Sequence, residues 1–257
     1  MPDTYESFKR EFLRLSGLDL NSYNEKQMKR RIDAFIDRSD YNSYYDFIKG
    51  MRQDLSLFHS FISYLTINVS SFFRNPEQWK VFEELIIPRL KSKRKTVHLW
   101  SAACSRGEEA YSLAMSLTGN AFPSKYDILA TDFDETVLSD AKNAIYTESD
   151  IKTIPENFKN KYVFERDGKY MLRGSITGNV TFKRHDLLSK IYPTGFDFIA
   201  CRNVTIYFTD DAKDYIYKKL SDSLVKDGVL FIGSTEQIKH PENYGFERLK
   251  SFFYVKV

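Results

Sequence analysis

Cysteine and histidine are scarce in this chain. Its 257 residues include two cysteines, Cys104 and Cys201, and four histidines. Two cysteines cannot form the disulfide framework of a small secreted domain, and the Cys and His spacings do not match a zinc site. We therefore expect no bound metal, and we expect Cys104 and Cys201 to be small buried thiols.

Long apolar runs are also missing. The most apolar stretch, residues 57–73, is interrupted by His59, four serines and Asn68, which excludes a membrane-spanning helix. Residues 1–12 are rich in charge and lack the apolar centre of a secretory signal. The sequence is thus expected to encode a cytoplasmic protein that does not insert directly into the membrane.

A strong excess of charge of one sign is absent as well. The net charge is +3, and the charged and hydrophobic fractions of 28% and 42% are ordinary for a globular domain. With no signature of a base-flipping pocket, this small surplus argues against nucleic acid as a partner or substrate. The densest basic cluster near the start is Lys26, Lys29, Arg30 and Arg31. Positions 26 and 30 share one face of an expected helix.

The first third of the chain has the apolar spacing of helices. From Tyr5 to about Leu90, apolar side chains recur at intervals of three and four residues. Polar breaks near Gly17, at residues 19–24 and at residues 39–42 separate the helices. The pattern predicts a small helical bundle with apolar positions at Phe8, Phe12, Leu15, Met28, Ile32, Phe35, Phe47, Ile48, Met51, Phe58, Phe61, Ile62 and Leu65.

The rest of the chain alternates short β-branched runs with helical segments, which is typical of a parallel α/β sheet. The expected strands are Val97–Trp100, Ile128–Ala130, Val180–Phe182, Phe196–Ala200, Val229–Gly233 and Phe252–Val255. The expected helices are Glu108–Leu117, Glu135–Ile145 and Asp210–Leu224. In such a doubly wound fold the ligand lies at the carboxyl ends of the strands, where the strand order reverses beside the first strand.

Two features at these strand ends suggest a nucleotide-like ligand. The first strand leads through small residues to Gly107, which can adopt a backbone conformation that other residues resist. The second strand ends at Asp132, where an acid commonly accepts hydrogen bonds from a ribose. A tight strand-to-helix turn and an Asp that caps the next helix are the structural alternatives. The loop lacks the G-x-G-x-x-G pattern of dinucleotide-binding folds.

Four segments in a fixed order make the sequence recognisable. They are residues 68–75 (NVSSFFRN), 100–112 (WSAACSRGEEAYS), 201–208 (CRNVTIYF) and 233–236 (GSTE). Together they closely resemble the CheR family of chemotaxis receptor methyltransferases, and the resemblance spans nearly the whole chain. A set of four motifs in family order is far more specific than any one of them.

The resemblance implies a helical N-terminal domain in residues 1–75. It also implies a Rossmann-like class I methyltransferase domain in residues 76–257, with a small antiparallel β-subdomain inserted at about residues 160–182. In this last segment Asp167-Gly168 is a favoured two-residue hairpin turn. The implied activity is transfer of a methyl group from S-adenosyl-L-methionine to receptor glutamates. The products would be glutamyl methyl esters and S-adenosyl-L-homocysteine.

The resemblance also implies roles for individual residues. Arg74 and Tyr207 would be catalytic, with Arg74 close to the incoming carboxylate and Tyr207 at the mouth of the site. The cofactor would be bound by Asn68, Ser70 and Arg74 at its methionine end, by Glu108 at its amino acid moiety, by Asp132 at its ribose, by Asp186 and Leu187 at its adenine, and by Arg202 and Asn203 near the sulfonium.

Three of these residues also have ordinary structural roles. Arg74 can serve as an ion-pair partner between domains, and Tyr207 as a core aromatic with an exposed hydroxyl. Glu108 can complement the dipole at a helix N-terminus. Their place within four matching motifs favours function.

The expected reaction agrees with what the sequence lacks. A glutamate carboxylate, with a reference pKa of about 4.3, is already a nucleophile at neutral pH and needs no general base. No nucleophilic triad pattern is present. The histidines His59, His98, His185 and His240 are scattered and are expected to be structural.

Two positions depart from the family pattern. Arg106 stands where a small residue is usual, and Thr205 where a larger apolar residue is usual. A cation at Arg106 could crowd the cofactor loop, so we expect it to point outward, toward Glu109 or solvent. Thr205 is expected to loosen local packing. These departures keep open an alternative function, a non-catalytic methyltransferase-fold module that binds receptor or senses S-adenosylmethionine.

The expected partner is the cytoplasmic domain of methyl-accepting chemotaxis receptors, an acidic helix bundle. The basic cluster at residues 26–31 could be simply a solvated helix surface. Given an acidic partner, we instead expect it to be the docking face.

Overall fold

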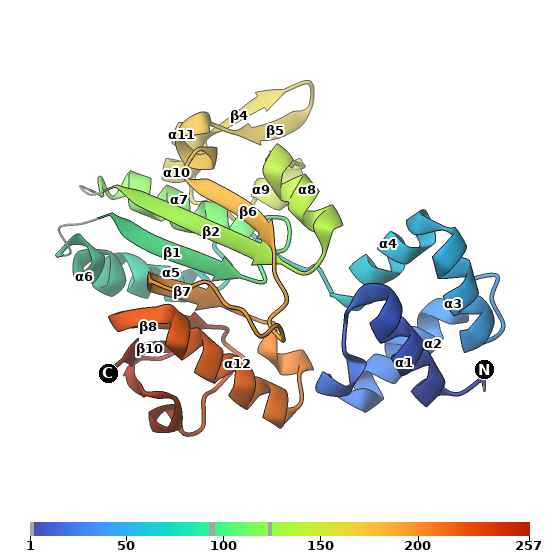
Figure 1. Cartoon of the computed structure of the whole chain (residues 1–257). Coiled ribbons are helices and arrows are strands. Elements are labelled where there is room, and N and C mark those ends of the chain that lie inside the picture. The colour runs from blue at the N-terminus through green and yellow to red at the C-terminus, as the bar shows by residue number, and fades with distance from the viewer. Residues whose placement is uncertain (1–2, 93–95, 123–124) are drawn as a thin grey trace. The chain divides into compact units, whose positions relative to one another are not determined.

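The computed structural model describes residues 3–92, 96–122 and 125–257. The chain divides into two compact units (Figure 1). The first contains residues up to Asn68 together with Ile206–Tyr215, and the second contains Val69–Thr205 and Ile216–Val257. The division lies between residues 68 and 69, whereas the resemblance placed it between 75 and 76. Within the described residues, no helix combines the length and the apolarity that a membrane crossing requires.

Within the described residues the first unit is a cluster of four α-helices. The second and third begin after the polar breaks predicted at residues 19–24 and 39–42, whereas the break before the fourth, at Asp54, was not predicted. The side chains of Thr4, Asn24, Ser43 and Asp54 each accept a hydrogen bond from the first turn of the helix that follows. Gly17 ends the first helix with a φ of 79°. The helices are α1 (Tyr5–Ser16), α2 (Glu25–Ile36), α3 (Tyr44–Gln53) and α4 (Leu55–Leu65).

Aromatic rings fill the centre of this unit. The ring of Phe61 lies edge-on to Phe47, Phe35 and Phe12, with centroid separations of 4.8, 5.0 and 5.4 Å. The segment 206–215 joins the same unit because the backbone of Phe208 forms a bridge with Tyr23, and Thr209 N–H donates to the carbonyl of Ser22 at 2.9 Å.

The second unit is built on a seven-stranded sheet in the order β6-β2-β1-β7-β8-β10-β9 (Figure 1). Its strands are β1 (Val97–Ala102), β2 (Tyr126–Asp132), β6 (Val180–Arg184), β7 (Phe196–Cys201), β8 (Leu224–Ile232), β9 (Phe246–Lys250) and β10 (Phe253–Lys256). The strands from β6 to β8 are parallel, and β10 is antiparallel to both its neighbours. The predicted α/β fold is confirmed. Strand β9 was not predicted, because three of its five residues are charged and only Phe246 is buried.

The strand order reverses at β1, as expected. Ala102 at the end of β1 is level with Thr131 on β2 and with Cys201 on β7. The loops that follow these three strands therefore leave the sheet side by side, at the place where doubly wound folds bind their ligands.

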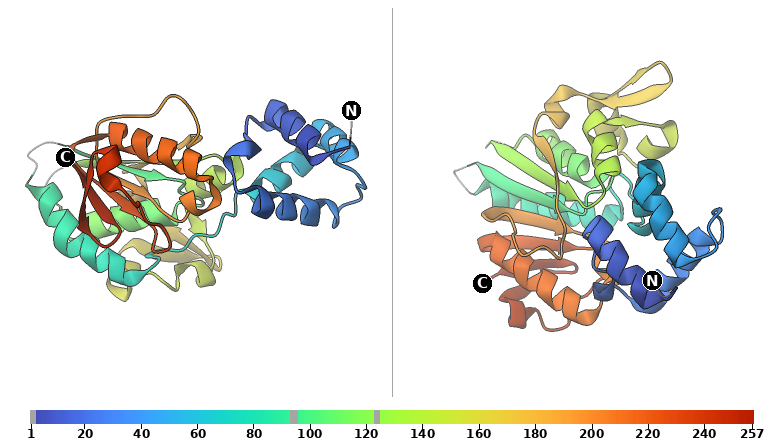
Figure 2. Two further views of the ribbon diagram at one scale, coloured as in Figure 1. Left: turned by 90° about the horizontal axis from the view of Figure 1, so that it is seen from below. Right: turned by 45° about the vertical axis from the view of Figure 1, so that its right-hand side comes forward.

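Helices cover both faces of the sheet. Figure 2 shows α12 (Asp210–Ser223) and the stretch from α5 (Pro76–Val81) to α6 (Ile87–Lys91) on opposite faces. A π-helical turn, Phe82–Ile86, joins α5 to α6. The sequence assigned residues 76–90 to the helical bundle, but they pack in the second unit. The other helices are α7 (Glu108–Gly119), α8 (Glu135–Asn143), α9 (Glu148–Ile151), α10 (Glu156–Tyr162) and α11 (Gly174–Thr177).

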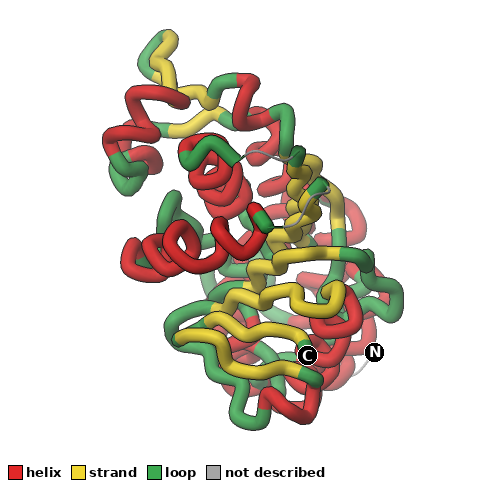
Figure 3. Tube along the Cα trace, turned by 90° about the vertical axis from the view of Figure 1, so that its left-hand side faces the viewer, coloured by secondary structure: helices red, strands yellow, loops and turns green. Residues whose placement is uncertain are grey.

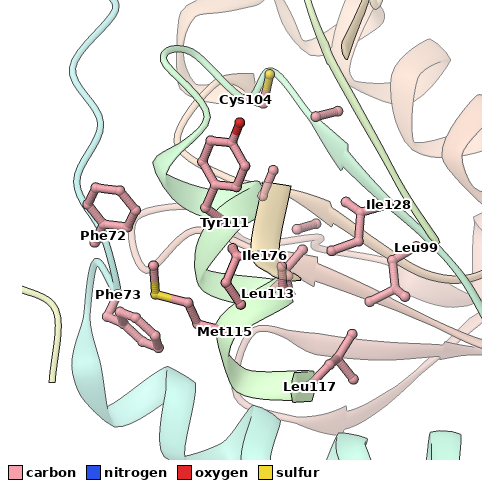
Figure 4. Close-up of a cluster of buried hydrophobic side chains, with 14 of the residues drawn as sticks. Phe72, Phe73, Leu99, Cys104, Tyr111, Leu113, Met115, Leu117, Ile128 and Ile176 are labelled. Carbon is pink, nitrogen blue, oxygen red and sulfur yellow. The ribbon is translucent and has the colours of Figure 1, made fainter. Parts of the chain in front are cut away.

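Helix α7 packs in the hydrophobic core of the second unit through apolar side chains. Leu113 and Leu117 face Leu99 and Ile128 of the central strands, while Phe72 and Phe73 lie on its other flank (Figure 4). All of these side chains are at most 3% exposed. Burying a Leu or Phe contributes about 1.5 to 3 kcal/mol each, so this core fixes α7 firmly beneath the β1 loop.

A second, three-stranded antiparallel sheet has the order β3-β5-β4. Its strands are β3 (Ile145–Tyr146), β4 (Val163–Arg166) and β5 (Lys169–Leu172), and its hairpin stands apart from the row of strands in the large sheet (Figure 3). Asp167 and Gly168 both have positive φ, 52° and 70°, which confirms the predicted turn. The small sheet differs from the expected insertion at 160–182. It includes β3, which precedes that range, and β6, from Val180, belongs to the large sheet.

Candidate functional site

The loop between β1 and α7 is wound tightly around left-handed residues. Ala103, Ser105 and Gly107 have φ values of 64°, 49° and 86°. A Cβ at Gly107 would lie 3.1 Å from the side chains of Ala141, Phe182 and Tyr111, so glycine is required there for space as well as for φ. The predicted special conformation of Gly107 is confirmed.

Asp132 holds this loop from the end of β2. Its two carboxylate oxygens accept from the backbone N–H groups of Ser105, at 2.8 Å, and Asp134, at 3.1 Å. Burial raises the pKa of Asp132, and these donors oppose that rise. Asp134, not Asp132, caps α8. Asp132 therefore lies at the end of β2, as the prediction of a ribose-binding acid requires. It also fixes the backbone of the loop.

Glu108, the first residue of α7, is buried with unused hydrogen-bonding capacity. It is 2% exposed, and the Ser70 hydroxyl hydrogen-bonds to its carboxylate. Its Oε2 and the Oγ of Ser105 have no hydrogen-bond partner among the described residues. Burial raises the pKa of Glu108. A buried carboxylate oxygen without a donor is costly unless a ligand supplies one.

The segment that carries Ser70 and Arg74 is tied to α7. Phe73 N–H donates to the Ser112 hydroxyl at 3.0 Å, and that hydroxyl donates to the Glu108 carbonyl at 2.6 Å. The guanidinium of Arg74 is half-buried and donates to the carbonyl of Val69 at 3.2 Å. The second unit thus brings Ser70 to Glu108 and ties the segment that also carries Arg74 to α7.

Arg202 has structural partners that the sequence did not predict, and its predicted place near the sulfonium stays a prediction. Its guanidinium donates to the carbonyl of Arg74 at 2.9 Å and to the side-chain oxygens of Asn75 and Gln78 at 3.1 and 2.7 Å. It also pairs with Glu109 at 3.3 Å and lies 4.4 Å from the ring centroid of Phe231. The side chain therefore holds the segment that carries Arg74, which gives Arg202 a structural function beyond the predicted contact near the sulfonium.

Asn203 and the adenine-site residues also lie at the ends of sheet strands. Asn203 follows β7 with a φ of 59°. Asp186 follows β6, and its carboxylate accepts from Leu188 N–H at 2.8 Å. Leu187 is buried, and its carbonyl accepts from the Tyr192 hydroxyl.

Asn68 and Tyr207 belong to the first unit. The Asn68 amide donates to the carbonyl of Ser63 at 3.4 Å. Tyr207 is half-buried in a short 3-10 turn, and its carbonyl accepts from Asn24 N–H at 2.9 Å. Their predicted roles at the cofactor and at the mouth of the site stay predictions.

The two departures from the family pattern are both accommodated. The Arg106 guanidinium pairs with Asp150 at 3.3 Å, so the expected partner, Glu109, was wrong. Glu109 instead accepts from Arg202 and from the Ser101 hydroxyl. Thr205 is 1% exposed and its hydroxyl is hydrogen-bonded, so the expected loose packing was also wrong.

Sequence reasoning gave no role to Ser105 or Glu236, and it considered Glu109 only as a partner for Arg106. Glu236, 5% exposed, accepts hydrogen bonds from the loop of Asn203. Glu109 and Glu236 lie inside the recognised motifs. Their acidic side chains within these motifs are the sequence feature that could have identified them.

The residues at this switch point fit S-adenosylmethionine. The free oxygen of Glu108 and the hydroxyls of Ser70 and Ser105 suit the ammonium group of its amino acid end, and the lone pairs that remain on Asp132 suit ribose hydroxyls.

Comparisons with known proteins agree with this geometry. Residues 68–253 match the family model of the CheR methyltransferase SAM binding domain, and residues 3–66 match that of the CheR all-alpha domain. The chemotaxis protein methyltransferase of Listeria innocua is 44% identical over 253 residues, which cover 98% of this chain and 97% of the relative. That of Escherichia coli K12 is 31% identical over 212 residues, covering 79% and 72%.

Among solved structures, PKMT2 from Rickettsia typhi in complex with AdoHcy aligns with 53% of this chain and 20% of its own, at 19% identity and a TM-score of 0.34. The two family models together cover nearly all of the sequence. The chain therefore belongs to the CheR family of S-adenosylmethionine-dependent chemotaxis methyltransferases.

Proposed function

We propose that this methyltransferase esterifies glutamate side chains on the cytoplasmic domains of chemotaxis receptors. The observation that carries the proposal is the position of Arg74. Its half-buried cation lies on the segment that delivers Ser70 to Glu108, and it is near enough to Arg202 to lower the pKa of that residue, after the larger effect of burial. A cation at the amino acid end of the cofactor site favours an anionic acceptor, and a glutamate carboxylate is one.

When bound, the cofactor supplies the methyl group on a sulfonium. In the proposed mechanism Glu108, Ser70 and Asp132 hold the cofactor, Asp186 and Leu187 border its adenine, and Asn203 lines the site near the reacting methyl. Arg74 would bind and orient the acceptor carboxylate. No residue has to remove a proton, because the carboxylate is already ionised at neutral pH. Asn68, Arg202 and Tyr207 complete the set of residues assigned by the family resemblance.

The partner is proposed to dock on α2, in the cytoplasm. The structure divides the basic cluster into two pairs. Lys29 pairs with Asp33 at 2.7 Å, and Arg31 donates to the carbonyl of Tyr64, whereas Lys26 and Arg30 are exposed on one face of the helix. Lys26 and Arg30 are thus the residues best placed to attract an acidic receptor helix.

The test is incubation of the protein with methyl-labelled S-adenosylmethionine and receptor-containing membranes. Label that is released by base, and that is absent from membranes without receptor, is the expected result. Arg74→Ala should lower kcat/KM for receptor far more than Arg89→Ala, which changes a half-buried arginine on α6 that pairs with Asp227. Tight cofactor binding without any base-labile label would overturn the proposal and leave the non-catalytic module as the function.

A further inference from the structure

Glu236 lies at the centre of a group of hydrogen bonds that the expected site residues do not explain. It follows β8 and is 5% exposed. Its Oε1 accepts from the backbone N–H groups of Val204 and Thr205 at 3.0 and 2.8 Å. The Thr205 hydroxyl donates to the same oxygen at 2.7 Å. Its Oε2 accepts from the N–H groups of Asn203 and Gly233 at 2.8 and 2.6 Å.

These contacts engage both oxygens of the carboxylate. A carboxylate offers about four lone-pair positions, and here it receives five donors. Three of the donors are consecutive backbone N–H groups, which form a concave nest that binds an anion. Glu236 therefore has no lone pair left for a ligand. Whatever it contributes to the site passes through the loop it binds.

The loop after β7 contains a residue with left-handed backbone that Glu236 contacts directly. Asn203 has a φ of 59°, in the left-handed region that non-glycine residues rarely adopt. The bond from its N–H to Glu236 stabilises that conformation. Its side chain is enclosed as well, because a Cβ at Gly233 would lie 2.8 Å from both Asn203 N and Nδ2 and 2.6 Å from Glu236 Oε2.

The same loop is held from its other end. Arg202, which directly precedes Asn203, is bound by Glu109 and by the segment that carries Arg74. Thr205, two residues after Asn203, shares its hydroxyl with Tyr217 of α12 at 3.1 Å. Asn203 is thus bound directly by the buried Glu236, and the residue before it is bound by the largely buried Glu109 on α7.

We infer that Glu236 is a positioning residue for methyl transfer, which holds Asn203 in the conformation that the cofactor site requires. The part of the inference that concerns methyl transfer to receptor rests on the proposed function. The cofactor site itself follows from family membership.

Glu236→Gln is the informative variant because it keeps the size of the side chain. In either amide orientation, its NH2 group would face at least two backbone N–H donors that now point at oxygen. The matched control is Glu247→Gln, an exposed glutamate on β9. Thr205→Val is a milder second variant, because it removes one donor and leaves the carboxylate in place. Thr205→Ser restores that donor.

The readouts are the Kd for S-adenosylhomocysteine by calorimetry and kcat/KM for receptor. Glu236→Gln should weaken both by about 10- to 100-fold, the range seen for groups that orient a ligand-binding residue. Thr205→Val should weaken affinity and kcat/KM by a smaller factor, and Thr205→Ser should have values closer to those of the wild type. Glu247→Gln should match the wild type in both. In an Asn203→Ala background, Glu236→Gln should have almost no further effect, because residues that act through each other are not additive.

Losses that simply add in the double variant, or wild-type affinity and turnover in Glu236→Gln, would overturn the inference. If the wild type binds cofactor but methylates no receptor, the proposed function fails. The binding measurements on the same variants still decide the role of Glu236. If Glu236→Gln does not fold, the Thr205 variants in both backgrounds give the same decision.

Discussion

Arg202 and Glu109 form a buried ion pair, with Nη1 of Arg202 3.3 Å from Oε2 of Glu109 and side-chain exposures of 2% and 12%. Burial lowers the pKa of Arg202 and raises that of Glu109, and the attraction between the two charges opposes both shifts. Three further acceptors, the carbonyl of Arg74 and the side-chain oxygens of Asn75 and Gln78, lie within hydrogen-bond distance of Arg202 Nη2, whereas its Nε has no partner among the described residues. The pair links α7 to the segment that carries Arg74.

Removing the negative partner should therefore destabilise the fold. We expect Glu109→Gln to lower the free energy of unfolding by about 3 kcal/mol, because it leaves a buried guanidinium without a counter-charge. For a domain of this size, that is a fall in Tm of roughly 6 to 12 °C. Thermal unfolding measured beside Glu77→Gln, which changes an exposed pair with Lys80, is the comparison. Equal Tm values would show that neutral acceptors suffice for Arg202.

Glu108 should make cofactor affinity depend on pH. Its carboxylate must be ionised to bind an ammonium group, and burial raises its pKa above the ordinary glutamate value. As pH falls through the raised pKa of the free enzyme, protons compete with the ligand, so the Kd for S-adenosylhomocysteine should rise. This dependence should be absent in Glu108→Gln, which should also bind more weakly. Calorimetry across that pH range tests both expectations.

The same pKa shift has the opposite consequence for stability. A carboxyl group whose pKa is raised by folding binds protons more tightly in the folded state, so its contribution to stability is present below its unfolded pKa and is lost as pH rises through the folded pKa. At neutral pH the ionised, buried Glu108 therefore costs stability in the ligand-free protein. We expect Glu108→Gln to raise Tm at neutral pH without ligand. A lower Tm would show that Ser70 and the helix N-terminus more than offset burial.

Asp132 should matter for cofactor affinity in two ways, through the ribose and through the loop that it holds. Asp132→Ala should weaken binding of S-adenosylhomocysteine by about 1.5 to 3 kcal/mol, roughly one to two orders of magnitude. Asp134→Ala, which removes the cap of α8 but no loop contact from Asp132, is the control. Unchanged affinity in Asp132→Ala would remove this residue from the site.

Much of this arrangement could be predicted from the sequence because it depends on local backbone rules. Gly107 after a strand and Asp167-Gly168 between two short strands favour left-handed backbone at those positions, and the caps of α1 to α4 follow from single residues. The partners of Arg202 could not be predicted, since they lie as far as 128 residues away and meet only when the strands align. The five donors of Glu236 likewise converge from two loops that only the sheet brings together.

The docking face on α2 should control encounter with receptor and leave the cofactor site unchanged. Lys26→Glu with Arg30→Glu reverses the two exposed charges and should slow methylation of whole receptor, most strongly at low salt. The Kd for S-adenosylhomocysteine should not move. Lys29→Gln is a matched change on the same helix, at a lysine already paired with Asp33. If the double variant methylates receptor as fast as the wild type at both low and high salt, this face is not the docking face.

Arg106 offers the last test, because it is the clearest departure from its family within the cofactor loop. Its guanidinium contacts Asp150 and lies 5.7 Å from the ring centroid of Tyr146, whose hydroxyl donates to the Arg106 carbonyl at 2.8 Å. Burial by itself would raise the pKa of Asp150, but hydrogen bonds from Thr147 and the charge of Arg106 lower it. The cation is therefore neutralised by a carboxylate that also caps α9.

Since both side chains are partly exposed, the pair of Arg106 and Asp150 contributes little to stability, about 0 to 1 kcal/mol. Arg106→Thr should accordingly change Tm and turnover only modestly, and Asp150→Asn should do no more. A rise in turnover of two orders of magnitude in Arg106→Thr would mean that the arginine obstructs the cofactor in solution, and it would favour the binding module over the enzyme.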